Sequence, residues 1–249
     1  MQITSIKFVI VATSFFLLTG CGEILDNFLD GQFPLNTKND GNKISIYADV
    51  TPETKVIVRG TYTSTKCERS HFNAAYTKVS YSPIKKEVVI ESVDDIDNKK
   101  SASFLPINGG GWCNWELIEI ELAPISVVSE SSSITYIRIP VIDNEKSKIK
   151  YFITMAPIIT KTKGKDTIHY SLSKRDAREI SNKKNGEIYF NYNVDHDLKT
   201  IVSNKNEIIF PNGSTKHGGS EVYSKFVSFD EIIKNSNKKE YTSYSEYLD

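Results

Sequence analysis

The chain has 249 residues, of which 39% are hydrophobic, 11% aromatic and 25% charged. Its 31 Lys and Arg residues balance 31 Asp and Glu residues, which disfavours a strongly basic nucleic-acid-binding protein. With only 8 Pro and 13 Gly, collagen-like and low-complexity proteins are excluded, and the length suits one domain or two small ones.

An apolar segment follows Lys7 at the N-terminus. Residues 8–18 are almost wholly apolar, but this stretch is shorter than the roughly 20 residues that cross a bilayer core. The pattern therefore predicts a secretory signal peptide over residues 1–20, rather than a membrane-spanning helix or a buried core helix.

The residues that follow, Leu18-Thr19-Gly20-Cys21, resemble the lipobox of bacterial lipoproteins. The resemblance implies cleavage before Cys21, a diacylglycerol on its sulfur and an acylated amino group. Several acyl chains anchor a protein firmly, whereas one chain alone is marginal. The alternative is an ordinary secreted protein whose Cys21 pairs with another cysteine. Gly22 and Glu23, rather than Asp, follow Cys21, which in such lipoproteins implies the outer membrane and its periplasmic face.

The mature chain would be almost neutral. Removing residues 1–20 removes one charge, that of Lys7, and leaves 30 cations and 31 anions. This balance predicts no long-range steering of the whole protein toward DNA or an anionic membrane.

Two cysteines remain after Cys21. Because the periplasm is oxidising, Cys67 and Cys113 are expected to form one disulfide. The alternative is a catalytic or redox thiol, but no Cys-x-x-Cys pattern occurs.

Residues 21–42 are predicted to be a lipidated tether, and residues 43–235 a β-rich periplasmic domain. Short runs rich in Ile, Val, Tyr and Thr, separated by polar turns, are typical of an all-β fold, mainly an antiparallel sandwich or barrel-like. We expect strands over residues 44–50, 54–63, 75–81, 87–91, 115–122, 134–142, 149–155, 167–172, 187–192, 200–210 and 221–227. Charge density rises near residues 160–185, where a subdomain break would fall.

One or two short helices are predicted near the C-terminus. Ser173 could cap a helix over residues 174–180, and Ser228 with Glu231 matches a capping box. Pro211-Asn212-Gly213-Ser214 predicts a hairpin turn. The polar tail, residues 236–249, carries three tyrosines and is either disordered or docked on the sheet.

No catalytic motif stands out, so the sequence predicts no catalytic residues, no cofactor and no metal site. Asp195-His196-Asp197 is the tightest His/carboxylate cluster, but neighbouring strand residues point to opposite faces and would not converge on a metal. The acidic run at Asp94, Asp95 and Asp97 lacks the order of a calcium loop and is better explained as a solvated turn.

A protein-binding surface is the more distinctive prediction. Trp112 and Trp115 lie close to Cys113 in the sequence. Either both pack in the core, or one of them faces outward and binds a partner. Ile118, Ile120 and Leu122 alternate with Glu119 and Glu121, which predicts that both glutamates face water or a protein partner. We therefore predict partner-binding residues at Trp112, Trp115, Glu119 and Glu121.

In overall organisation the chain is similar to the immunity lipoproteins that neutralise type VI-secreted lipase effectors in the periplasm. This resemblance implies a membrane-anchored protein that binds a toxin, with no enzymatic activity and no nucleic-acid partner. Two alternatives stay open: a structural, assembly or adhesin lipoprotein of the cell envelope, and a hydrolase with a dispersed site around His196 or His217.

Overall fold

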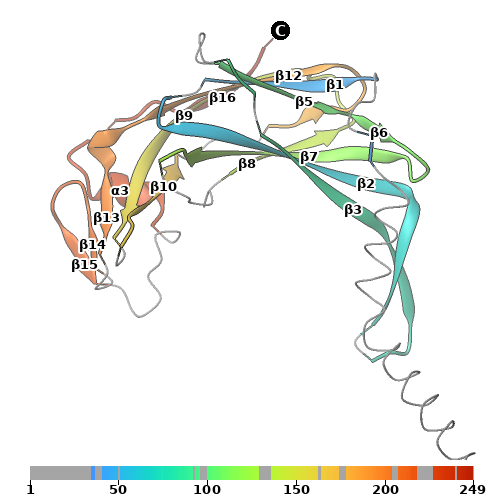
Figure 1. Ribbon diagram of the computed structural model, residues 1–249, viewed down its shortest axis with the longest axis horizontal. Helices are drawn as coiled ribbons and strands as arrows, with labels where there is room; N and C mark the ends of the chain where they lie inside the picture. The colour runs from blue at the N-terminus through green and yellow to red at the C-terminus, as the bar shows by residue number, and fades with distance from the viewer. Residues whose placement is uncertain are drawn as a thin grey trace, which may run out of the picture.

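The computed structural model describes residues 35–36, 41–49, 51–73, 75–91, 93–95, 100–128, 136–161, 164–173, 178–203, 207–217, 227–238 and 240–248. These residues form two mixed β-sheets packed face to face, with one α-helix near the C-terminus (Figure 1). The prediction of an all-β sandwich is therefore confirmed.

The larger sheet has ten strands and is built around the long strand β9 (Lys148–Thr160). Successive stretches of β9 pair in parallel with β12 and β13, and in antiparallel with β16 and β10. The bounds are β1 (Lys43–Asp49), β4 (Val93–Asp95), β5 (Lys100–Pro106), β10 (Thr167–Leu172), β12 (Gly186–Val194), β13 (Thr200–Val202), β14 (Glu207–Ile209), β15 (Thr215–His217) and β16 (Tyr244–Tyr247).

The smaller sheet has six strands, and its central strands β2, β7 and β8 pair in antiparallel. Its bounds are β2 (Thr54–Phe72), β3 (Val79–Glu91), β6 (Asn108–Gly110), β7 (Trp115–Ser126), β8 (Ile137–Ile142) and β11 (Ile180–Ser181). Alternate residues of the two sheets fill the space between them because successive strand side chains point to opposite faces. Tyr62, Trp115, Ile120, Tyr151 and Phe190 are among the largest side chains of this core.

A second, smaller apolar cluster lies where β13 and β14 meet the helix α3 (Phe229–Lys234). Ser228 caps α3, and its side chain accepts a hydrogen bond from the backbone N–H of Glu231, as the capping box predicts. The hairpin turn before it is also confirmed, with Gly213 at a φ of 82° between β14 and β15.

The helix predicted over residues 174–180 is wrong at its C-terminal end. Ile180 is fully buried in β11 and pairs in parallel with Val141 of β8, while residues 174–177 lie outside the described part of the chain. The Ser173 hydroxyl bridges β-structure instead: it accepts from the N–H of Thr154 and donates to Ser243.

Several strand boundaries also differ from the predicted ones. The predicted run 54–63 continues to Phe72 in β2. The two predicted runs 75–81 and 87–91 are one strand, β3, which begins only at Val79 because residues 75–78 form the turn before it. The run 200–210 divides into β13 and β14, and most of 221–227 lies outside the described residues. In the tail, β16 pairs with β9, so this part of the tail docks on the sheet.

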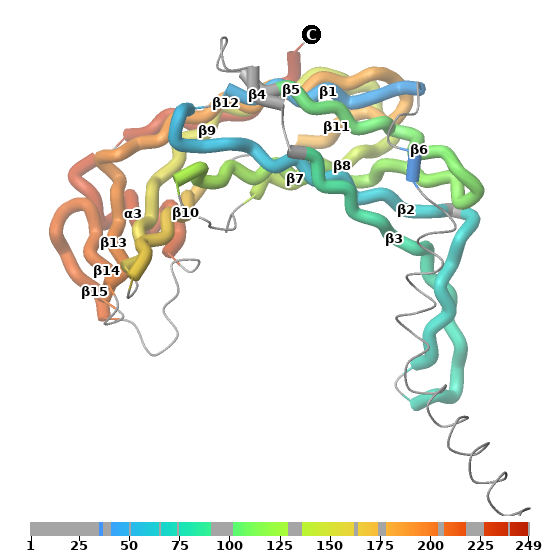
Figure 2. The backbone as a smooth tube through the Cα atoms, in the orientation of Figure 1, coloured from blue at the N-terminus to red at the C-terminus, as the bar shows by residue number. Residues whose placement is uncertain are grey.

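The ends of β2 and β3 leave the sandwich as a projecting hairpin, drawn in cyan and teal in Figure 2. We call residues 66–86 the arm. Pairing of β2 with β3 slips between Thr63 and Glu68, where four β2 residues oppose one residue of β3. The predicted disulfide, Cys67–Cys113, is present at this point and joins the base of the arm to the turn between β6 and β7.

Candidate functional site

The two tryptophans occupy opposite environments. Trp115 is buried in the core at the start of β7, whereas the side chain of Trp112 is 76% exposed on the preceding turn. Gly110, Gly111 and Asn114 all have positive φ there, which tightens the turn and directs Trp112 outward. The Ser64 hydroxyl donates to the carbonyl of Cys113 at 2.5 Å, so the turn is fixed by the disulfide and by a buried hydrogen bond.

The apolar face of β7 is not the predicted Ile118, Ile120 and Leu122. Pairing with β2 slips between Thr61 and Tyr62, and Ile118 is the extra residue in β7. The inward-facing residues are therefore Trp115 and Leu117 before this bulge, and Ile120 and Leu122 after it.

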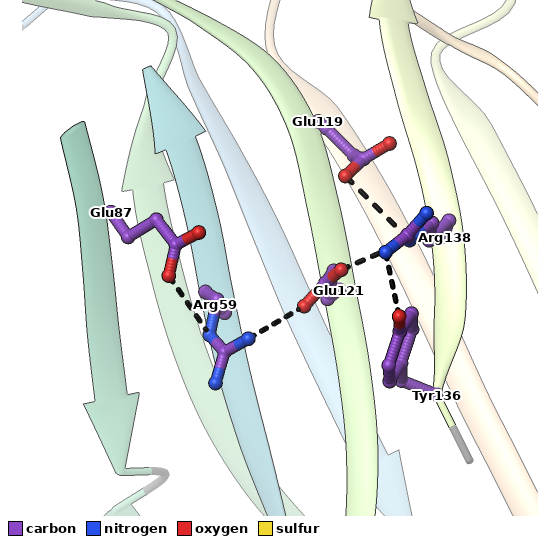
Figure 3. Close-up of polar contacts among 6 residues, drawn as sticks. All are labelled: Arg59, Glu87, Glu119, Glu121, Tyr136 and Arg138. Atoms are coloured by element: carbon purple, nitrogen blue, oxygen red, sulfur yellow. Dashed lines mark hydrogen bonds and ion pairs between the residues drawn. The ribbon is translucent and has the colours of Figure 1, made fainter. Parts of the chain in front are cut away.

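Glu119 and Glu121 lie on the outer face of the smaller sheet, where Glu121 is part of a row of charges (Figure 3). Arg59 of β2 and Arg138 of β8 stand directly opposite Glu121 in the two neighbouring strands. Arg59 Nη1 donates to Glu121 Oε2 and Arg138 Nε donates to Glu121 Oε1, each at 3.0 Å.

The row is completed by two further carboxylates and a phenol. Glu87 Oε2 lies 3.6 Å from Arg59 Nε, and Glu119 Oε1 lies 3.9 Å from Arg138 Nε. Arg138 also donates to the hydroxyl of Tyr136 at 2.6 Å. We call Glu87, Arg59, Glu121, Arg138, Glu119 and Tyr136 the charged row.

Only Glu121 of the charged row is buried, with 9% of its side chain exposed. Two guanidinium groups compensate the desolvation of its carboxylate. The hydrogen bond to Glu121 raises the pKa of Arg138. Both oxygens of Glu121 thus accept a hydrogen bond from a guanidinium group. The row presents charges of alternating sign at fixed positions on an open sheet face.

The Asp195-His196-Asp197 cluster lies on a turn and not on the predicted strand. His196–Leu198 forms a 3-10 turn, η1, which Asp195 caps by accepting from the N–H of Asp197. Asp195 is buried and ion-paired with Lys238, whose pKa this hydrogen bond raises. His196 Nε2 lies 3.0 Å from Glu53 Oε1. Asp195 and His196 thus have different partners, Lys238 and Glu53, and do not converge on one site.

A cavity of about 600 Å³ lies beside this turn, with Asp195, Lys238, Phe152 and Tyr241 in its wall. Among the described residues, no hydrogen bond joins His196 or His217 to a serine, which is the pairing that a serine hydrolase would show.

The residues that the structure describes contain no group of three or more His, Cys, Asp or Glu side chains placed to hold a metal ion. No helix that the structure describes is long and apolar enough to cross a membrane. Cys21 and Asp97 lie outside the described residues, and Asp94 and Asp95 fall in β4.

Sequence reasoning missed Arg59, Arg138 and Tyr136 because nothing in the sequence says which strands become neighbours of β7. It also missed the exposed aromatic residues of the arm. Residues 64–72 are mostly polar and charged, so no signal in the sequence indicates that β2 continues past Thr63 to Phe72.

Comparison of the chain with known proteins identifies no related protein. No family model matches the chain, and no curated protein and no solved structure matches it. The fold and its surfaces therefore define the protein only as a two-sheet β-sandwich that carries a charged sheet face and a projecting hairpin.

Proposed function

We propose that this chain is a lipid-anchored binding protein of the bacterial periplasm, which uses the charged row to recognise a protein partner. Its anchor would be the acylated Cys21 predicted from Leu18-Thr19-Gly20-Cys21, at the periplasmic face of the outer membrane.

The charged row is the observation that carries the binding proposal. Arg and Tyr are enriched among the residues that dominate binding energy in protein interfaces. Arg138 and Tyr136 hold each other by a hydrogen bond, and the guanidinium carbon of Arg138 lies 4.7 Å from the centre of the Tyr136 ring. Their rotamers are thus fixed before binding, which lowers the entropic cost of forming an interface.

The partner we propose is a secreted antibacterial effector such as a lipase, so that the protein acts as an immunity protein. Alternating charges select a complementary pattern and penalise other partners, as one toxin and its cognate inhibitor require. The organisation of the chain supports this class: a predicted export signal and anchor, followed by one β-rich unit.

The test is complex formation with the toxin encoded beside this gene, measured by calorimetry and by survival of cells that express the toxin in the periplasm. Glu119→Lys with Tyr136→Ser should weaken binding at least tenfold and abolish protection, because both side chains belong to the charged row. Both contact Arg138 and not the buried Glu121, so the fold should stay intact. Glu246→Lys with Tyr47→Ser is the matched control: Glu246 also pairs with a cation at 3.9 Å, and Tyr47 is as exposed as Tyr136.

Loss of protection in the first variant alone would support the proposal. The absence of any toxin beside the gene, or equal behaviour of the two variants, would overturn it. A lipoprotein found at the outer leaflet, together with unchanged survival, would favour the envelope-assembly alternative.

A further inference from the structure

The most exposed aromatic side chains of the described chain gather at one end of the molecule. Phe72, Tyr76, Tyr81 and Trp112 are 60%, 80%, 67% and 76% exposed. The first three lie on the arm, and Trp112 lies on the turn that the Cys67–Cys113 disulfide joins to the base of the arm. Clustered exposed apolar side chains mark a contact surface, whereas single ones are ordinary.

The arm is two-sided. Phe72 stands opposite Val79, and Ser70 opposite Tyr81, so the apolar side chains Phe72, Val79 and Tyr81 share one face. His71 and Ser80 pair between these two pairs, so their side chains point to the opposite face, which is polar.

The tip adds to the apolar face. The rings of Phe72 and Tyr76 lie 6.0 Å apart, and Tyr76 has a φ of 55°, a conformation that costs free energy for a tyrosine. The Asn73 side chain holds this turn by accepting from the N–H groups of Thr77 and Lys78.

The arm is also basic, although the whole chain is neutral. Residues 66–86 contain five cations and one anion, Glu68, which gives a net charge of +4. Lys66, Arg69 and Lys78 lie along the arm, and Lys85 and Lys86 lie at its base, opposite Thr63 and Tyr62. The overall charge balance therefore conceals a local surface that attracts anions.

The predicted membrane tether enters the domain at this same end. Leu35 packs against Gly109, and the N–H of Asn36 donates to the carbonyl of Gly109, at the start of the turn that carries Trp112. Figure 2 shows residues 35–36, in blue, beside β6 and close to the base of the arm. The stretch from Cys21 to Leu35 spans at most about 50 Å, so this end of the domain must stay near an anchored Cys21.

We propose that the apolar face of the arm and Trp112 dock on an anionic phospholipid bilayer, as a second membrane contact beside the lipid anchor. Aromatic side chains prefer the interface between headgroups and acyl chains, and neighbouring Lys and Arg residues attract anionic headgroups. The orientation argument rests on the anchor of the proposed function, but the chemistry of the surface does not.

The test uses the mature chain, residues 21–249, with Cys21→Ser, so that no acyl chain contributes. It is sedimented with vesicles of phosphatidylcholine alone or mixed with phosphatidylglycerol. We expect binding to the anionic vesicles only, weakened at least tenfold by Phe72→Ser with Tyr81→Ser and also by Lys78→Glu. Phe104→Ser with Tyr47→Ser, and Lys199→Glu, are the matched controls on other exposed surfaces and should bind as the parent does.

Brominated lipids provide the second readout. They should quench Trp112 and not the buried Trp115, and the quenching should disappear in Trp112→Phe. No binding to anionic vesicles, or equal losses in the control variants, would overturn the proposal. So would arm variants that bind vesicles normally but fail to bind the toxin, because the arm would then be a protein-binding surface. A failure of the proposed function can be distinguished from a failure of this proposal. It would be seen as no complex with the toxin, or as a Cys21 that carries no acyl groups, whatever the result with vesicles.

Discussion

The two halves of the β2–β3 hairpin are both paired antiparallel strands, but their surroundings are opposite. In the body, Val56, Val58 and Tyr62 of β2 are buried against the larger sheet. In the arm, residues 68–72 of β2 are exposed whichever way their side chains point. The difference shows that strand pairing alone does not create a core: a second sheet must cover one face.

The larger sheet packs closely against β2 at Gly60. A Cβ atom at this position would meet Leu105 of β5 at 2.9 Å, so the two sheets approach closely here because β2 has no side chain. Beyond Thr63 the pairing slips, the disulfide fixes the chain, and the larger sheet no longer covers β2.

The sharpest test of this contrast replaces one tyrosine in each half. Tyr62→Ala should lower the free energy of unfolding by about 3–5 kcal/mol, because it empties a fully buried site and removes the hydrogen bond to the carbonyl of Pro106. Tyr81→Ala should change it by about 0.5 kcal/mol or less, since its side chain is mostly exposed. Urea denaturation measures both, and similar losses would show that the arm is packed like the body.

The junction between the halves should contribute the next largest effect. Cys67→Ser with Cys113→Ser opens a link across a sequence separation of 46 and should cost about 2–4 kcal/mol. Cys21→Ser is the control and should leave the unfolding midpoint unchanged. An unchanged midpoint in the double variant would mean that the disulfide does not restrain the unfolded chain.

Within the charged row, burial should decide which carboxylate stabilises the fold. Glu121→Gln should cost about 1–3 kcal/mol, because two arginines lose a charged partner that is largely excluded from water. Glu119→Gln should cost no more than about 1 kcal/mol, since its contact with Arg138 is longer and more exposed. Equal costs in denaturant titrations would contradict the assigned geometry.

The body should also show a dependence on alkaline pH. Burial raises the pKa of Tyr62 above its usual value of 10.0 and raises the pKa of Tyr170 to about 12. Both groups stay protonated more readily in the folded protein, so their stabilising effect is complete below pH 10 and is lost as the pH rises from 10 toward 12. Tyr62→Phe should flatten this loss, whereas Tyr81→Phe should follow the parent curve.

Local pattern was sufficient to predict the sandwich, the disulfide, the turn at Gly213 and the cap of α3, because each depends on residues close in sequence or on a count of cysteines. The charged row was only half predicted. Glu119 and Glu121 could be assigned to the outer face, but Arg59 and Arg138 become their neighbours only through strand pairing across long stretches of chain. The bulge at Ile118 and the burial of Ile180 were missed for the same reason.

Hydrogen exchange of the mature Cys21→Ser chain, free and bound to vesicles containing phosphatidylglycerol, tests the division of the hairpin most directly. The amides of Val56 to Tyr62 should exchange slowly in both states, because they open only when the whole domain unfolds. Those of Glu68 to Phe72 should exchange much faster in solution and slow markedly on the vesicles. Arm amides that are as slow as the body's in solution, or that do not respond to the vesicles, would contradict this division.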